Sequence, residues 1–199
     1  MPPVTRFLAI CVLALGLSGC GVTNIPTFEE QDKADWAQVE NKYQRRADLT
    51  PDLVETVKGY AAQERETLEA VVKARAAATP ATLPPELLTD PAAFQKFQQA
   101  QSQLGGALSR LLVTVERYPD LKSSQNFLKL QDQLEGTENR IAVAQRDYIE
   151  AVRKYNTELV TFPGRIWAMV LYTDAEPKQN FTVDNVQGIE TAPRIQMSQ

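Results

Sequence analysis

The sequence predicts an all-α protein: an antiparallel four-helix bundle with long helices, preceded by a cleaved lipoprotein signal peptide and followed by a mobile C-terminal tail. Three observations predict this fold class. Apolar residues recur at helical and heptad spacing, prolines and glycines separate those stretches, and most connections are short. Such helices bury their apolar stripes most simply against one another. We expect a signal peptide at 1–19, a tether at 20–27, the bundle at 28–173 and an irregular tail at 174–199.

The N-terminal segment has the pattern of an export signal. Arg6 precedes an apolar stretch from Phe7 to Leu17, which is about eleven residues long and therefore shorter than the roughly twenty needed to span a bilayer. The stretch ends in Leu-Ser-Gly-Cys, which resembles the bacterial lipobox. The resemblance implies that the chain is cut before Cys20 and that Cys20 is lipidated. The alternative is a plain signal peptide with an incidental cysteine.

Two helices are expected after the tether. The first runs from Phe28 to about Arg46, because its apolar residues fall at helical spacing. The run Asp48-Leu49-Thr50-Pro51 then predicts a break. Thr50 can cap, and Pro51 can open, a second helix that continues to about Ala78.

A third helix follows a loop from Thr79 to Pro91, where four prolines disfavour helix. Apolar residues at 3–4 spacing predict helix from Phe94 to Tyr118, and Pro119 ends or redirects it. The pair Gly105-Gly106 lowers helix propensity by roughly 1 kcal/mol per glycine, so it indicates a bend, a close helix contact or a tolerated weak spot.

The fourth helix gives the strongest pattern, because every seventh residue is apolar or aromatic over some 37 residues at a rise of about 1.5 Å each. The tyrosines are expected in the core rather than in a ligand groove between helices, and they are Tyr43, Tyr60, Tyr118, Tyr148 and Tyr155. Phe162-Pro163-Gly164 interrupts the pattern, and a short helix is expected from Arg165 to Tyr172. The seam consists of Phe127, Leu134, Ile141, Tyr148, Tyr155 and Phe162.

Composition excludes several function classes. The chain of 199 residues is 43% hydrophobic, 23% charged and has a net charge of −4, so bulk charge does not favour nucleic acid. Histidine is absent, which removes the usual general base and the commonest zinc ligand. Of the two cysteines, Cys11 lies in the expected leader and Cys20 would carry lipid, so no free thiol is expected in the mature domain. We therefore expect no cofactor, no metal and no catalytic residue.

Several stretches resemble the LemA family. They are WAQVENKYQRRADLTPDLVETVKGYAAQE from Trp36, ARA from Ala74 and YPDLKSSQNFLKLQDQLEGTENRI from Tyr118, and the similarity continues to about Phe181. The resemblance implies an envelope protein with an N-terminal membrane attachment and a four-helix bundle, without a securely established enzymatic activity. Two departures are the lipobox, where many members keep an uncleaved anchor, and Gln63, where members often have histidine.

A few polar side chains fall on apolar faces or near the expected turn. Glu64 and Arg75 would face the core, where each is expected to pair with an opposite charge on a neighbouring helix; a partly buried carboxylate acting as an acid or base is the alternative. A polar cluster of Arg45, Arg46, Asp48 and Lys58 would tie the turn between the first two helices to the bundle or bind an anion. Glu135 and Glu138 share one face, but a solvated or ion-paired stripe is expected there rather than a metal site.

These features favour a lipid-anchored envelope protein that acts as a scaffold or adaptor for other envelope proteins. The alternatives are an enzyme or accessory subunit using groove carboxylates such as Glu64, and a small-ligand or peptide carrier. Because Gly21 rather than aspartate follows Cys20, sorting to the outer membrane, facing the periplasm, is expected in a cell with two membranes.

Overall fold

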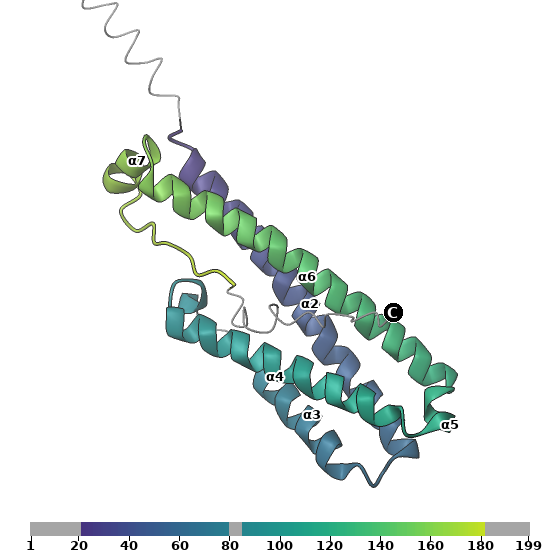
Figure 1. The fold of residues 1–199 in the computed structure, drawn as a ribbon. Coiled ribbons are helices and arrows are strands. Elements are labelled where there is room, and N and C mark those ends of the chain that lie inside the picture. The colour runs from purple at the N-terminus through teal and green to yellow at the C-terminus, as the bar shows by residue number, and fades with distance from the viewer. Residues whose placement is uncertain (1–20, 80–84, 182–199) are drawn as a thin grey trace, which may run out of the picture.

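The computed structural model describes residues 21–79 and 85–181, and all regular structure in those ranges is helical, so the all-α class is confirmed (Figure 1). The predicted signal peptide, Cys20 and the last part of the predicted tail lie outside the described residues. The elements are α2 (Asn24–Tyr60), α3 (Arg65–Ala78), the 3-10 turn η1 (Pro85–Leu88), α4 (Pro91–Val115), α5 (Pro119–Lys122), α6 (Gln125–Val160) and α7 (Gly164–Val170).

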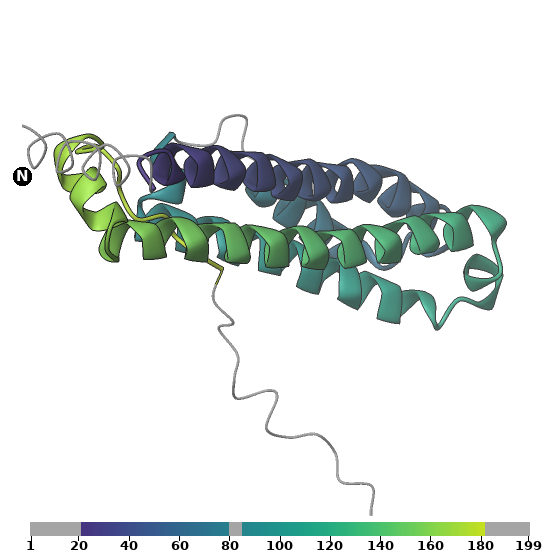
Figure 2. The same ribbon diagram turned by 90° about the horizontal axis from the view of Figure 1, so that it is seen from above.

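Two long helices, α2 and α6, lie side by side over most of the molecule and make its most extensive helix pair (Figures 1 and 2). They are antiparallel, because Asn24 near the start of α2 donates to Glu158 near the end of α6. The shorter helices α3 and α4 form a second antiparallel pair, which packs on α2. The small helix α7 lies at the end of the molecule where α2 begins and α6 ends.

The break predicted at Asp48–Pro51 is wrong, because α2 continues through Pro51 to Tyr60. A proline inside a helix leaves the carbonyl four residues earlier without its N–H donor. Here that carbonyl belongs to Ala47, and the Nε of Arg75 in α3 donates to it at 2.7 Å. The chain instead leaves the helix after Tyr60, and α3 begins at Arg65. The second half of the predicted tether is also helical, because α2 begins at Asn24.

The predicted fourth helix is present as α6, and its seam is buried with one exception. Phe162 lies beyond the end of α6 and is 81% exposed, so its predicted place in the core is wrong. The buried residues of α6 are Phe127, Leu134, Thr137, Ile141, Ala144, Tyr148, Ala151, Val152, Tyr155 and Leu159.

The core changes character along the molecule. Around α3 and the adjoining ends of α4 and α6 it is mainly aliphatic, with Leu53, Leu104 and Leu111 among the buried side chains; we call this the aliphatic cluster. Between α2, α6 and the start of α4 lies the aromatic cluster, which includes Trp36, Tyr43, Phe94, Phe97 and Tyr148. A small end cluster of Ile25, Tyr155 and Leu159 packs against α7.

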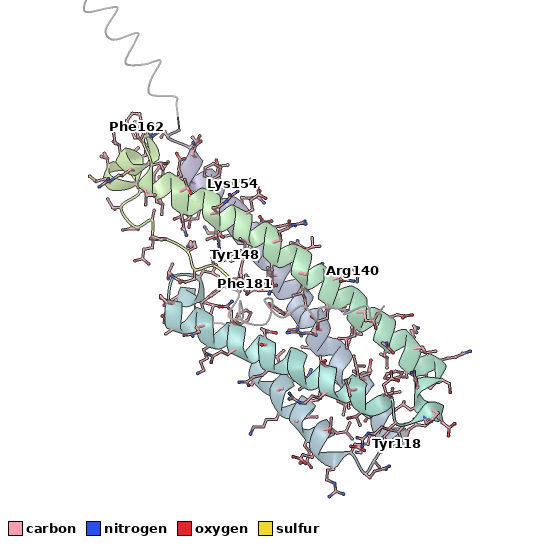
Figure 3. The ribbon with its side chains drawn as sticks, in the orientation of Figure 1. Tyr118, Arg140, Tyr148, Lys154, Phe162 and Phe181 are labelled. Atoms are coloured by element: carbon pink, nitrogen blue, oxygen red, sulfur yellow. The ribbon has the colours of Figure 1, made fainter. Side chains whose placement is uncertain are left out.

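The first part of the predicted tail, residues 174–181, is irregular but packs against the helices, and we call it the strap. Tyr148 donates its hydroxyl proton to the carbonyl of Gln179 at 2.9 Å, and the backbone of Lys178 forms two hydrogen bonds with the Asn156 amide at 2.8 and 2.9 Å. Phe181 ends the strap beside Tyr148 (Figure 3). The strap is therefore a packed part of the fold rather than a loose extension.

Candidate functional site

The most connected polar group in the described structure is Arg46 of α2, which points inward and is 4% exposed. Its guanidinium donates to both carboxylate oxygens of Glu138 in α6, at 3.1 and 3.2 Å. It also donates to the backbone carbonyl and the side-chain oxygen of Gln101 in α4, at 3.0 and 2.7 Å. The guanidinium carbon lies 5.0 Å from the ring centre of Tyr43. Arg46 therefore joins α2, α4 and α6 at one point, which we call the Arg46 junction.

Gln101 extends the Arg46 junction to α3. Its side-chain amide donates to the carbonyl of Ala78, the last residue of α3, at 2.8 Å. The glycine pair predicted to mark a bend or close contact lies here, and a Cβ on Gly105 would be 3.6 Å from the Arg46 guanidinium. Gly105 therefore lies in α4 where the arginine of another helix approaches it.

The predicted turn cluster does not exist as one group. All four of its residues lie in the continuous helix α2, and Arg45 and Lys58 are separated by about 20 Å along the helix at 1.5 Å per residue. Arg46 is buried, whereas Arg45, Asp48 and Lys58 are exposed. Asp48 accepts a hydrogen bond from Gln44 within the same helix, at 2.7 Å. The predicted turn depends on Pro51 as the start of a helix, whereas α2 continues through Pro51.

The two predicted core polar residues, Glu64 and Arg75, do not pair with each other. Glu64 lies between α2 and α3 with its side chain 17% exposed, where it pairs with Arg117 at 3.1 Å and accepts from the Tyr118 hydroxyl at 2.7 Å. This hydrogen bond raises the pKa of Tyr118. Arg75 is half-buried and donates to the Ala47 carbonyl freed by Pro51. Glu64 thus ties the α2–α3 connection to the α4–α5 connection.

A buried carboxylate, Asp32, is the polar residue that sequence reasoning missed. It is 0% exposed, and neither of its oxygens has a hydrogen-bond partner among the described residues. Burial raises its pKa to about 6, while the charge of Lys178 in the strap acts in the opposite direction. The signal was present in the sequence, because Asp32 falls between Phe28 and Trp36 on the apolar face of α2.

The tyrosines divide between core and surface. Tyr43, Tyr148 and Tyr155 are buried, as the seam predicts, and desolvation raises the pKa of each. Tyr60 is exposed at the end of α2, so its expected core position is wrong. Tyr118 is half-buried at the start of α5, where its hydroxyl meets Glu64.

Beside the Arg46 junction is a shallow hollow of about 220 Å³, lined in part by Tyr43, Phe97 and Gln101. Two of its polar lining residues are already engaged, because Gln101 bonds to Arg46 and Ala78, and the Tyr43 hydroxyl accepts from Gln145 at 2.5 Å. Over residues 21–79 and 85–181, no three His, Cys, Asp or Glu side chains gather in a way that could hold a metal ion. None of the helices in these ranges is long and apolar enough to cross a bilayer.

Comparison with known proteins gives one family and three partial relatives. The model of the LemA family matches residues 35–197. Magnetosome proteins MamQ 1 and MamQ 2 of Paramagnetospirillum magneticum are each 32% identical over 85 residues. Magnetosome protein MamQ of Magnetospirillum gryphiswaldense is 29% identical over 85 residues. In each case the similarity covers 43% of this chain and 31% of the relative, so the chain spans about a third of the length of these relatives.

Proposed function

This chain belongs to the LemA family, and from that premise we propose that it is a lipid-anchored envelope protein that acts as a non-enzymatic scaffold or adaptor. In this proposal α2, α3, α4 and α6 work as one antiparallel four-helix bundle, and a lipid on Cys20 holds the bundle at the membrane. Its partners are other envelope proteins that bind the outer faces of the helices. The magnetosome relatives are similar to this chain over only part of their length, so the proposal does not include a magnetosome location.

The non-enzymatic role is supported by the contacts that Arg46, Glu64 and Arg75 make within the protein. Arg46 contacts Glu138 and Gln101, Glu64 contacts Arg117 and Tyr118, and Arg75 contacts the α2 backbone. Side chains engaged in this way hold helices in register, and a substrate would have to break these contacts to reach them. The arrangement therefore supports a stable rod whose surface does the work.

The membrane attachment rests on the Leu-Ser-Gly-Cys sequence that ends at Cys20, since two or more acyl chains hold a protein where a single chain is marginal. We propose the outer membrane, facing the periplasm, because Gly21 follows the cysteine. The test is labelling of living cells with an alkyne fatty acid, followed by membrane fractionation. Cys20→Ala should lose both label and membrane retention, while Cys11→Ala, in the expected leader, should keep both. Retention of Cys20→Ala without label would contradict the anchor.

The scaffold role is tested by photo-cross-linking in cells. A photoreactive residue is placed at Val143 on α6 or at Val113 on α4, both of which are exposed. We expect the same envelope partner to be captured repeatedly at one position and not at the other, because a specific interface covers one face only. The capture should disappear when Arg46→Ala loosens the junction. Repeated failure to capture any partner at positions around the rod would contradict a scaffold.

A further inference from the structure

Exposed apolar side chains gather at one end of the molecule. Among the described residues, six of the twelve large exposed hydrophobic side chains fall between positions 160 and 171. Soluble surfaces rarely leave such a group uncovered unless it binds something. The six are Val160, Phe162, Ile166, Met169, Val170 and Leu171, with exposed fractions from 48% to 81%.

The short helix α7 has apolar side chains on both of its faces. Trp167 and Ala168 pack against the end cluster, whereas Met169 and Val170 on the other side are exposed. Arg165 is the single charged residue of α7. A helix that is apolar all round is normally covered on every side, so the outer face of α7 lacks its cover.

The first described residues of the chain, which directly follow Cys20, lie at the same end of the molecule. A Cβ on Gly21 would lie 3.3 Å from the Pro163 ring, and the Tyr172 hydroxyl donates to the carbonyl of Val22 at 3.0 Å. The residues just before and just after α7 therefore hold the first described residues of the chain. Phe162 marks this end in Figure 3, and Tyr118 marks the opposite end. A lipid on Cys20, bonded to Gly21, would be attached beside the exposed apolar side chains.

We propose that the outer face of α7, together with Val160, Phe162 and Leu171, enters the surface of the lipid bilayer beside the acylated Cys20. This inference rests on the proposed lipid anchor and adds a second membrane contact to it. Apolar side chains at the headgroup boundary exchange water for acyl chains, and a nearby cation such as Arg165 suits an anionic headgroup region. Two attachments at one end would also limit how far the rod can tilt, whereas a flexible anchor alone would not.

The test uses the acylated full-length protein in vesicles of phosphatidylethanolamine and phosphatidylglycerol. An environment-sensitive fluorophore is attached to a new cysteine in Met169→Cys or, as the matched control, in Val113→Cys. The two native positions are equally exposed, at 68% and 69%, but Val113 lies near the end of α4, far from α7. We expect a blue shift and several-fold stronger quenching by nitroxide lipids at position 169, and strong iodide quenching at position 113 only.

The outcomes separate this inference from the anchor. If the protein is acylated and bound to vesicles but both labels respond alike, the bilayer contact of α7 is wrong and the anchor stands. If the label at position 169 becomes protected only at high protein density, a second copy covers α7, and the inference is also overturned. If the protein is neither acylated nor bound to the vesicles, the anchor and the inference fail together.

Discussion

The two halves of the molecule bury polar groups in different ways. The distal half, formed by the aliphatic cluster and the Arg46 junction, gives each of its inward charged side chains at least one partner, although the Nε of Arg46 has none among the described residues. The proximal half, formed by the aromatic cluster, the end cluster and the strap, encloses Asp32 without a hydrogen bond. The stability of the distal half therefore depends on hydrogen-bond geometry. The stability of the proximal half depends on pH and on the strap, which follows α7 and folds back along the helices.

The largest expected effect is in the distal half. Arg46→Ala would leave the side-chain oxygen of Gln101 without a donor and would remove the charge-assisted pair with Glu138. We expect the free energy of unfolding to fall by about 4 kcal/mol, because each loss costs about 1–3 kcal/mol. Urea denaturation of the unmodified protein and of Arg46→Ala measures this loss of stability. The control is Arg45→Ala, an exposed neighbour in α2 that should change stability by less than about 0.5 kcal/mol. Equal losses in the two variants would show that the junction does not hold the helices.

The second prediction concerns Asp32 and the pH dependence of stability. In the unfolded chain its pKa is near 3.8, and in the folded protein burial raises it to about 6. Between these values the folded state binds more protons than the unfolded state, so stability falls as pH rises. The difference corresponds to a loss of about 3 kcal/mol, present in full above pH 6 and absent below the unfolded value.

Urea denaturation between pH 4 and pH 7 tests this prediction. The variant Asp32→Asn should remove the Asp32 part of the pH dependence, because the amide does not titrate. The control is Asp52→Asn, an exposed carboxyl on the same helix, which should keep the dependence of the unmodified protein. A pH profile shared by all three proteins would mean that water or an ion reaches Asp32 and stabilises its charge.

The third prediction concerns the strap. Phe181 lies with its ring centre 5.2 Å from that of Phe94 and 5.7 Å from that of Tyr148. Because Phe181 is only half-buried, Phe181→Ala should cost about 2 kcal/mol, which is less than a fully buried phenylalanine. The matched control is Phe162→Ala, which removes the same ring from a site that is 81% exposed and should be nearly neutral in solution. Thermal unfolding followed by near-ultraviolet circular dichroism would detect the difference.

Periodicity in the sequence was sufficient to predict the helical class, the fourth helix and most of its buried face. Those features depend on residue spacing within one segment. Arg46 and Asp32 also lie on the apolar face of α2, so residue spacing alone was sufficient to predict their burial. Their partners were not, because Glu138 and Gln101 are 92 and 55 residues away from Arg46 in sequence. The packing of the strap could not be predicted either, because Phe181 belongs to no periodic pattern and packs against rings that are distant in sequence.

The prediction that failed most clearly was the break at Pro51, and its cause lies in another helix. A proline within a helix costs about 3 kcal/mol, partly because one carbonyl loses its donor. Arg75, 28 residues further along, supplies a donor to that carbonyl, and Leu49 and Leu53 on either side of the proline are buried. Local rules describe the cost correctly, but tertiary contacts outside the segment offset it.

The smallest expected effect tests that explanation directly. Arg75→Ala should lower stability by about 1 kcal/mol, because the Ala47 carbonyl then has no protein donor. The control is Lys73→Ala, an exposed residue of α3 that should have almost no effect.

A double-mutant cycle with Pro51→Ala then separates this hydrogen bond from other roles of Arg75. Alanine at position 51 restores an N–H four residues after Ala47, so the carbonyl regains a donor within α2. In that background Arg75→Ala should cost little, and the coupling between the two substitutions should account for most of the loss of about 1 kcal/mol. If Arg75→Ala costs the same with either residue at position 51, Arg75 stabilises the protein by packing against α2, and Pro51 is tolerated for another reason.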